Sequence, residues 1–215
     1  MEGRTDEREA ADLAERAARL GVPLDAAQAG RLLRFLDELA QWNRAYNLTS
    51  IDDRAQAISH HLLDSLAGSS ALSGPRVLDI GTGAGLPGIP LAVARPDIQF
   101  TLIDGTAKKV RFVAHAARVL GLANVAGVHA RAEDYPADEP FDEAIVRAVA
   151  SVPELAQLAR PLVKPGGRLV AWKGRVPSEE LAAPIPGWGA PQVQVVDVPG
   201  LGEERCLVTL PRLAG

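Results

Sequence analysis

The first third of the chain repeats apolar residues at helical spacing, three or four positions apart. From about residue 6 to residue 72 there are few strand signals. The spacing is clearest in the set Leu32, Phe35, Leu36, Leu39, Trp42 and Tyr46. Asp25 is expected to cap the helix that carries this set, and the helix before it is expected to end at Gly21. A third helix is expected over residues 54–69.

After Pro75 the pattern changes to short apolar runs separated by helical stretches. The runs expected to be strands are residues 77–80, 100–104, 125–130, 144–146, 168–173, 192–198 and 206–210. Helices are expected over residues 89–94, 107–120 and 152–163. Because strands that alternate with helices form sheets covered on both faces, the pattern predicts a doubly wound α/β fold with a mostly parallel seven-stranded sheet. The last two strands are expected to form an antiparallel hairpin at its edge.

Chain length, composition and charge limit the number of domains and the class of protein. We expect a helical segment over residues 1–72 and an α/β domain over residues 73–215, because a chain of 215 residues with 47% hydrophobic content suffices for one core with a small appendage. The formal net charge of -4 gives no overall basic footprint, so any nucleic-acid surface has to be a local patch. One cysteine excludes an internal disulfide, and no apolar run approaches the length of a membrane span. We therefore expect a soluble, cytoplasmic protein.

A glycine-rich turn follows the first expected strand. Gly81, Gly83 and Gly85 stand at alternate positions between that strand and the next helix. Glycines let backbone amides approach a ligand closely, and Asp104 ends the next strand, where an acid can accept from ribose hydroxyls. The turn is therefore a candidate nucleoside site. The alternative is a turn that only packs the strand against the helix.

Asp79 helps to choose between the two ligand classes that use such a turn. A carboxylate at the end of the first strand repels the pyrophosphate of a dinucleotide, but it favours the cationic methionine portion of S-adenosylmethionine. The less favoured alternative is that Asp79 caps the amides of its own turn. This charge argument ranks a methyltransferase first and a nicotinamide-dependent oxidoreductase second.

Other polar residues are expected at the same carboxyl edge of the sheet. Glu133 follows the third strand and can contact an adenine edge, although a solvated loop acid is an equal alternative. Arg147 ends an apolar strand and needs a partner, which is a cofactor carboxylate, an RNA phosphate or a neighbouring acid. His60 and His61 are adjacent, which is poor geometry for two ligands of one metal, so no metal site is expected.

Two further groups of residues bear on which molecule receives the methyl group. The stretch from Trp42 to Thr49 is rich in amides and aromatic residues, which suits either a docked helix end or a surface that faces the substrate. The basic residues Lys108, Lys109, Arg111, Lys173 and Arg175 are expected near the ligand edge, where they can hold phosphates.

These residues together resemble a known family, the bacterial 16S rRNA guanine-N7 methyltransferases called RsmG or glucose-inhibited division protein B. The resemblance covers nearly the whole chain. The motifs that carry it are Trp42-Asn43 with Asn47-Leu48-Thr49, His61 with Asp64-Ser65-Leu66, the run from Leu78 to Pro90, Asp104 with Lys108-Lys109, Arg131-Ala132-Glu133, Arg147-Ala148 and Lys173-Gly174. The glycine motif alone is shared by many methyltransferases, but the combination is specific.

The resemblance implies a Rossmann-like class I methyltransferase that moves a methyl group from S-adenosylmethionine to guanine N7 in 16S rRNA of the small ribosomal subunit. It implies cofactor contacts at Gly81, Leu86, Asp104, Ala132, Glu133 and Arg147. One departure is Gly105, where relatives more often have serine, which affects only a local hydrogen bond near the ribose.

The expected chemistry needs no general base. Guanine N7 carries a free lone pair, so in-line placement and exclusion of water suffice, and we name no catalytic acid or base. We expect Asn47, Lys109 and Lys173 to position an unpaired RNA base, in a protein that acts as a monomer. A small-molecule methyltransferase, favoured by the acidic net charge, and a non-enzymatic cofactor-binding module in ribosome assembly are the alternatives.

Overall fold

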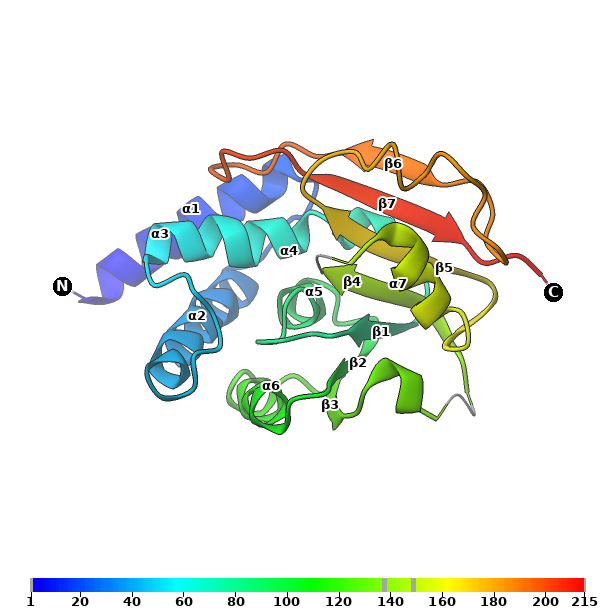
Figure 1. Cartoon of the computed structure of the whole chain (residues 1–215). Helices are drawn as coiled ribbons and strands as arrows, with labels where there is room; N and C mark the ends of the chain where they lie inside the picture. The colour runs from blue at the N-terminus through cyan, green and yellow to red at the C-terminus, as the bar shows by residue number, and fades with distance from the viewer. Residues whose placement is uncertain (1, 137–138, 148–149, 215) are drawn as a thin grey trace.

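The structure is a computed structural model that describes residues 2–136, 139–147 and 150–214. Within these residues one sheet holds seven strands in the order β3-β2-β1-β4-β5-β7-β6 (Figure 1). The strands are β1 Arg76–Ile80, β2 Gln99–Asp104, β3 Val125–His129, β4 Phe141–Arg147, β5 Val163–Lys173, β6 Gln192–Val195 and β7 Cys206–Pro211. Strands β1 to β5 run parallel, and β7 runs antiparallel to both β5 and β6. The predicted fold class and the antiparallel pair at the edge are confirmed.

The helices fall into two groups along the chain. Before β1 come α1 Glu2–Arg19, α2 Ala26–Tyr46, α3 Arg54–Ala57, the π-helix η1 Ile58–Leu63, α4 Asp64–Leu66 and the 3₁₀ turn η2 Ser69–Ala71. After β1 come α5 Gly88–Ala94, α6 Ala107–Val119, the 3₁₀ turn η3 Ala132–Asp134 and α7 Val152–Ala159. In Figure 1 the helices from α1 to α4 lie on the side toward which the arrowheads of β1, β4 and β5 point. The N-terminal helices therefore stand beside the carboxyl edge of the sheet.

The helix boundaries follow local chemistry. Asp25 caps α2 as expected: its side chain accepts from Gln28 N at 2.6 Å, and the Gln28 side chain accepts in return from Asp25 N at 2.9 Å. The predicted third helix is continuous from α3 to α4, but its middle is π-helical, which spacing alone did not indicate. Such π turns are rare and occur often at functional sites.

Several predicted elements were too long, and in two of them strand pairing explains the difference. The helix predicted over residues 152–163 ends at Ala159, because Val163 already pairs with Phe141 as the start of β5. The strand predicted over residues 192–198 ends at Val195, where its pairing with Cys206 of β7 stops. In both cases the partner strand, and not the local apolar pattern, decides where the element ends.

The sheet is packed on both faces. One hydrophobic core joins α1, α2, the helix around Leu62, α5 and α6 to residues of the sheet such as Phe100 and Trp172. The other joins α7 and the region of Ile185 and Trp188 to residues such as Ile103. Because the N-terminal helices share a continuous core with α5 and α6, the boundary between residues 72 and 73 stays a prediction.

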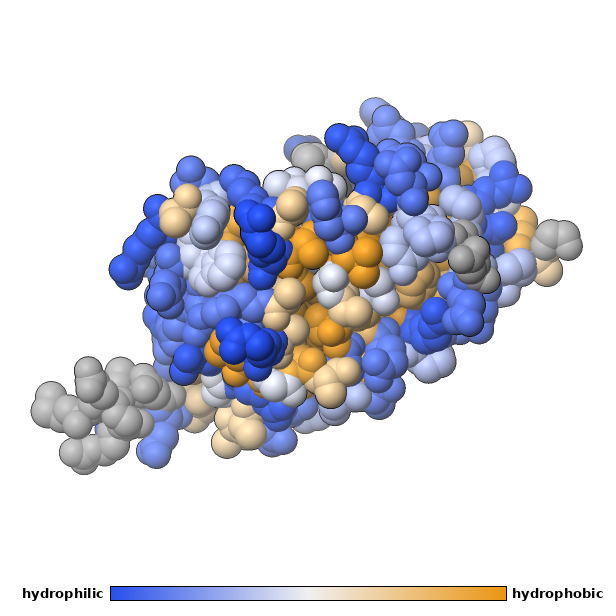
Figure 2. Space-filling view, turned by 90° about the horizontal axis from the view of Figure 1, so that it is seen from below, coloured by the Kyte–Doolittle hydropathy of each residue, from blue (hydrophilic) through white to orange (hydrophobic). Residues whose placement is uncertain are grey.

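The two edges of the sheet differ. All four residues of β6 are exposed, whereas β3 contacts α6 and is partly covered. Figure 2 shows the molecule from below, on the side where β3 lies in Figure 1; hydrophobic residues gather in the middle of this view and hydrophilic residues surround them. None of the helices in the described residues is long and apolar enough to cross a bilayer.

A substitution at Gly88 tests the close packing of α5 on the sheet. A Cβ there would stand 2.7 Å from Asp79 Oδ2 and 2.8 Å from the Leu102 side chain. We expect Gly88→Ala to lower the free energy of unfolding by about 1–3 kcal/mol, measured by urea denaturation, because both neighbours are buried.

The matched control is Gly30→Ala in α2, where an added Cβ meets nothing within 4 Å. This variant should gain about 0.5–1 kcal/mol from the better helix propensity of alanine. Equal stability of the two variants would contradict the close approach at Gly88.

Candidate active site

The turn between β1 and α5 depends on its glycines. Gly81, Gly83 and Gly85 have φ values of 69°, 60° and 80°, a region that other residues rarely adopt. Gly85 N and Leu86 N both donate to Thr82 O, and Thr82 N donates to Ile103 O of β2 at 3.0 Å. A Cβ at Gly81 would meet nothing within 4 Å, so the turn leaves open space above its backbone. The turn is therefore both tightly bonded and accessible.

Asp79 lies beneath this turn and is completely buried. Its Oδ2 accepts from Thr82 Oγ1 at 2.6 Å and from Gly88 N at 2.9 Å. Burial raises the pKa of Asp79 to about 7. Among the described residues, its Oδ1 has no hydrogen-bond partner. The carboxyl group thus caps its own turn, which is the alternative interpretation of this residue.

A cavity of about 300 Å³ opens between the turn and the ends of β2 and β3. Four of the six predicted cofactor residues line it: Gly81, Asp104, Ala132 and Glu133. Asp104 Oδ2 accepts from Gly83 N at 3.0 Å, and its Oδ1 accepts from Thr106 N at 2.8 Å. Lys109 Nζ also approaches Oδ2 at 3.5 Å, whereas Oδ1 keeps a second lone pair, so Asp104 can hold the turn and still accept from a ribose hydroxyl at Oδ1.

The cavity suits a nucleoside. Ile80, Ile103 and Leu158 supply apolar walls, and the polar groups of Asp104 and Glu133 stand at its edges. Of the two remaining predicted residues, Leu86 is buried in the core beside the turn, and Arg147 lies at the end of β4. Neither Leu86 nor Arg147 lines this cavity. If they contact the same ligand, they contact the part of it that lies outside the cavity.

Arg147 is held by the N-terminal helices. Its Nη1 donates to His60 O at 2.8 Å and to Asp64 Oδ2 at 3.1 Å. Arg205, just before β7, lies with its Nε 2.6 Å from the other oxygen of Asp64. Of the partners proposed for Arg147, the neighbouring acid is therefore present. The Asp64 side chain is 2% exposed, so one buried carboxylate joins η1 and α4 to two arginines of the sheet.

Trp172 adds a further tie to the same helix, because its Nε1 donates to Asp64 O at 2.9 Å. Arg147 and Arg205 carry two positive charges against the one negative charge of Asp64, so these three side chains, the Asp64 cluster, have one formal positive charge in excess. The helical segment over residues 54–66 is thereby fixed over the ends of β4 and β5.

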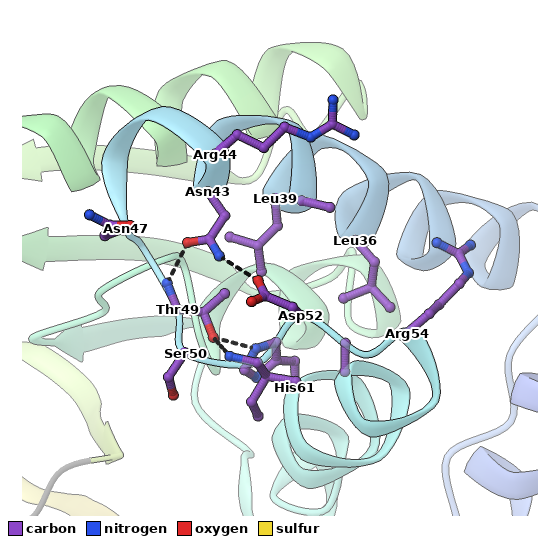
Figure 3. A pocket seen from close by; sticks show the side chains of 13 residues that line it. Leu36, Leu39, Asn43, Arg44, Asn47, Thr49, Ser50, Asp52, Arg54 and His61 are labelled. Carbon is purple, nitrogen blue, oxygen red and sulfur yellow. Dashed lines mark hydrogen bonds between the residues drawn. The ribbon is translucent and has the colours of Figure 1, made fainter.

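A second and larger cavity, of about 690 Å³, lies between α2 and residues 49–61 (Figure 3). The Asn43 side chain closes the loop beside it: Oδ1 accepts from Leu48 N and Thr49 N, and Nδ2 donates to Asp52. Thr49 Oγ1 lies 2.9 Å from His61 Nε2. Burial, and then the charge of Arg147, lowers the pKa of His61 to about 4, so this imidazole is neutral at pH 7.

The predicted RNA residues are dispersed around the two cavities. Asn47 is exposed and lines the larger cavity. Lys109 Nζ stands 3.5 Å from Asp104, beside the smaller one. Lys173 is largely enclosed, since its Nζ donates to Ala150 O at 3.0 Å and pairs with Glu180 at 3.2 Å. Ala148, which the sequence motif includes, lies outside the described residues.

Sequence reasoning gave no individual role to Asp64 or Arg205, and it considered Thr49 only as the end of the stretch from Trp42 to Thr49. Asp64 and Thr49 belong to recognisable motifs, but their spacing does not say which distant side chains they meet. Arg205 stands between an acid and the last strand with no signal of its own. The described residues contain no cluster of three His, Cys, Asp or Glu side chains suited to a metal ion.

The chain matches the family described as rRNA small subunit methyltransferase G over residues 28–208. It belongs to this family. The ribosomal RNA small subunit methyltransferase G of Methylococcus capsulatus is 48% identical over 191 residues, covering 89% of this chain and 93% of the relative. That of Nitrosococcus oceani is 46% identical over 197 residues, covering 91% and 92%. The family predicted from the sequence motifs is confirmed.

Solved structures support the fold of this rRNA small subunit methyltransferase G family member. The N-methyltransferase NodS from Bradyrhizobium japonicum has a TM-score of 0.55 at 16% identity and covers 76% of this chain and all of its own. The O-methyltransferase TomG from Streptomyces achromogenes, solved in complex with SAM, has a TM-score of 0.52 at 21% identity and covers 90% and 92%. At these identities the likeness concerns the fold alone.

Asp79 predicts a pH dependence of stability. Its folded pKa of about 7 lies above the ordinary 3.8, so the native protein keeps a proton that the unfolded chain loses, and its contribution to stability falls as pH rises from about 4 to 7. Asp79→Asn removes this term. Urea denaturation should therefore show the stability of the variant relative to the wild type increasing between pH 4.5 and 7.

His61 has the opposite effect in the same range, because its pKa is lowered and its contribution to stability rises with pH. It is present in both proteins, so it cancels in the comparison. A difference between variant and wild type that stays constant with pH would show that Asp79 is ionised throughout.

Asp64 predicts a large stability effect. Asp64→Ala leaves two partly buried arginines without their carboxylate, so the free energy of unfolding should fall by about 3–5 kcal/mol. The control is Asp12→Ala, which removes an exposed pair with Arg16 on α1 and should cost about 0.5 kcal/mol or less. Similar midpoints in thermal unfolding for both variants would refute the structural role of Asp64.

Proposed function

We propose that the chain transfers the methyl group of S-adenosylmethionine to N7 of one guanine in 16S rRNA. The observation that carries this proposal is the family match over residues 28–208, combined with a nucleoside-sized cavity on the glycine turn. The small-molecule and non-enzymatic alternatives have no comparable support. Local cations at Lys108 and Lys109 offset the acidic net charge where RNA has to approach.

The cofactor role is proposed for Gly81, Leu86, Asp104, Ala132, Glu133 and Arg147. Asp104 binds the ribose hydroxyls, and the backbone at Ala132 with the Glu133 carboxylate reads the adenine edge. Arg147 holds the cofactor carboxylate, which balances the extra positive charge of the Asp64 cluster. When bound, S-adenosylmethionine supplies an electrophilic methyl group.

The protein's own contribution to the reaction is to position the guanine base and to exclude water. Guanine N7 attacks with its own lone pair, so the protein needs no base to remove a proton. In duplex RNA this atom lies in a deep and narrow groove, so the target base has to be unpaired. Asn47, Lys109 and Lys173 are proposed to hold it, Asn47 and Lys109 beside the cavities and Lys173 at the end of β5.

The proposal also covers the form of the RNA acceptor, the oligomeric state and the cellular compartment. The acceptor is 16S rRNA, free or within the small subunit, and the chain acts as a monomer without a metal ion in the cytoplasm. Size-exclusion chromatography of the protein with and without rRNA checks the monomer.

The transfer itself is tested with radiolabelled S-adenosylmethionine. The acceptors are 16S rRNA and small subunits from cells that lack the gene, and the labelled nucleotide is then mapped. We expect label at one guanine N7, and we expect Asp104→Ala to reduce transfer by weakening cofactor binding about 5- to 150-fold, or about 1–3 kcal/mol.

Asp97→Ala is the matched control, since Asp97 is an exposed acid just before β2 that pairs with Arg95. It should transfer like the wild type. Cofactor binding without any label on either acceptor would reject the rRNA assignment and leave the fold intact.

A further inference from the structure

Apart from Asn47 in its lining, the larger cavity between α2 and residues 49–61 has no role in the function proposed so far. We propose that it receives an extruded nucleotide of the rRNA substrate. This inference rests on the proposed function, because it assumes RNA as the acceptor.

The cavity has the size and walls for such a ligand. Its volume of about 690 Å³ is more than twice that of the cofactor cavity, at about 300 Å³. Leu36, Leu39 and Ile51 supply apolar surface, and amide and hydroxyl side chains surround it. A nucleobase has the matching form, with apolar faces and polar edges, and stacks on apolar side chains when it leaves a helix.

The walls are fixed before any ligand arrives. Figure 3 shows the Asn43 amide reaching the loop on one side and the Thr49 to His61 contact crossing the base of the cavity. The Asn43 amide also donates to Asp52, the acid among the lining residues. The loop is therefore preorganised, so a nucleotide would not have to order it on binding.

Unused polar groups stand at the rim. Within the described residues, the side chains of Arg44, Asn47 and Ser50 have no hydrogen bond or ion pair, and all three residues are exposed. Lys108 adds positive charge next to them, because its Nζ donates to Tyr46 O at the end of α2. These groups suit a phosphodiester at the mouth and a base inside.

The cavity also lies beside the proposed methyl-transfer site. His61 forms part of its lining, and the carbonyl of the preceding His60 accepts from Arg147 at the end of β4. A base extruded at the carboxyl edge of the sheet is thus close to the opening. RNA methylation at N7 requires an unpaired nucleotide, and this cavity offers an extruded nucleotide a place to bind.

The test fills the cavity from two walls. Ala40→Trp places an indole in it from an exposed position on α2, and Ser50→Trp does so from the loop. Ala45→Trp is the matched control, since Ala45 is exposed on the same helix and does not line the cavity. Each variant is assayed for binding to a 16S rRNA transcript by anisotropy, for single-turnover transfer, for cofactor affinity and for thermal midpoint.

We expect both filling variants to weaken rRNA binding or slow transfer at least tenfold, with unchanged cofactor affinity and thermal midpoint, while Ala45→Trp behaves like the wild type. Wild-type transfer and binding in both filling variants would overturn the cavity assignment and leave the proposed function standing. Absence of transfer by the wild-type protein would overturn both.

Discussion

One buried carboxylate oxygen organises the centre of this molecule. Asp79 Oδ2 accepts from the Thr82 hydroxyl and from the Gly88 amide, and so fixes both the glycine turn and the start of α5. The absence of a side chain at Gly88 lets the helix come this close. Because the turn is held from below, its upper surface needs no side chains of its own, and the cavity opens there between β2 and β3. A ligand site thus follows from a packing constraint on the opposite side of the same backbone.

The N-terminal helices complete the site and do not merely adjoin it. They share a core with α5 and α6, and the π-helical turn leads directly into Asp64, the carboxylate that meets Arg147 and Arg205. A buried carboxylate is costly without partners, so this segment is stable only against the finished sheet. The same segment carries His61 into the wall of the larger cavity. The docking of the helices, the position of Arg147 and one wall of the larger cavity therefore depend on one stretch of about a dozen residues.

Much of the fold and part of the candidate site could be predicted from the sequence. The features that could not be predicted depend on contacts between distant residues. Apolar periodicity predicted the sheet and every long helix. The spacing of the turn glycines with Asp104 predicted a nucleoside site, and Gly81 and Asp104 do border a cavity. The end of α7 was wrong because the pairing of Val163 with Phe141 is a contact between distant residues. The π-helical turn and the Asp64 cluster were missed for the same reason, since a helix pattern does not reveal which arginine its acid will meet. For Asp79 the sequence favoured a charge role and kept capping as the alternative; the hydrogen bonds from Thr82 and Gly88 show the cap, and burial raises the pKa of this side chain.

The position of Arg205 bears on how the protein is made. Asp64 lies in the first third of the chain and Arg205 just before the last strand, so on the ribosome the acid is synthesised long before its second partner. Until β7 emerges and pairs with β5, the helix over the carboxyl edge has only Arg147 to neutralise its acid. The helical segment over residues 54–66 would then gain its second buried partner only after β7 has been synthesised and has paired with β5.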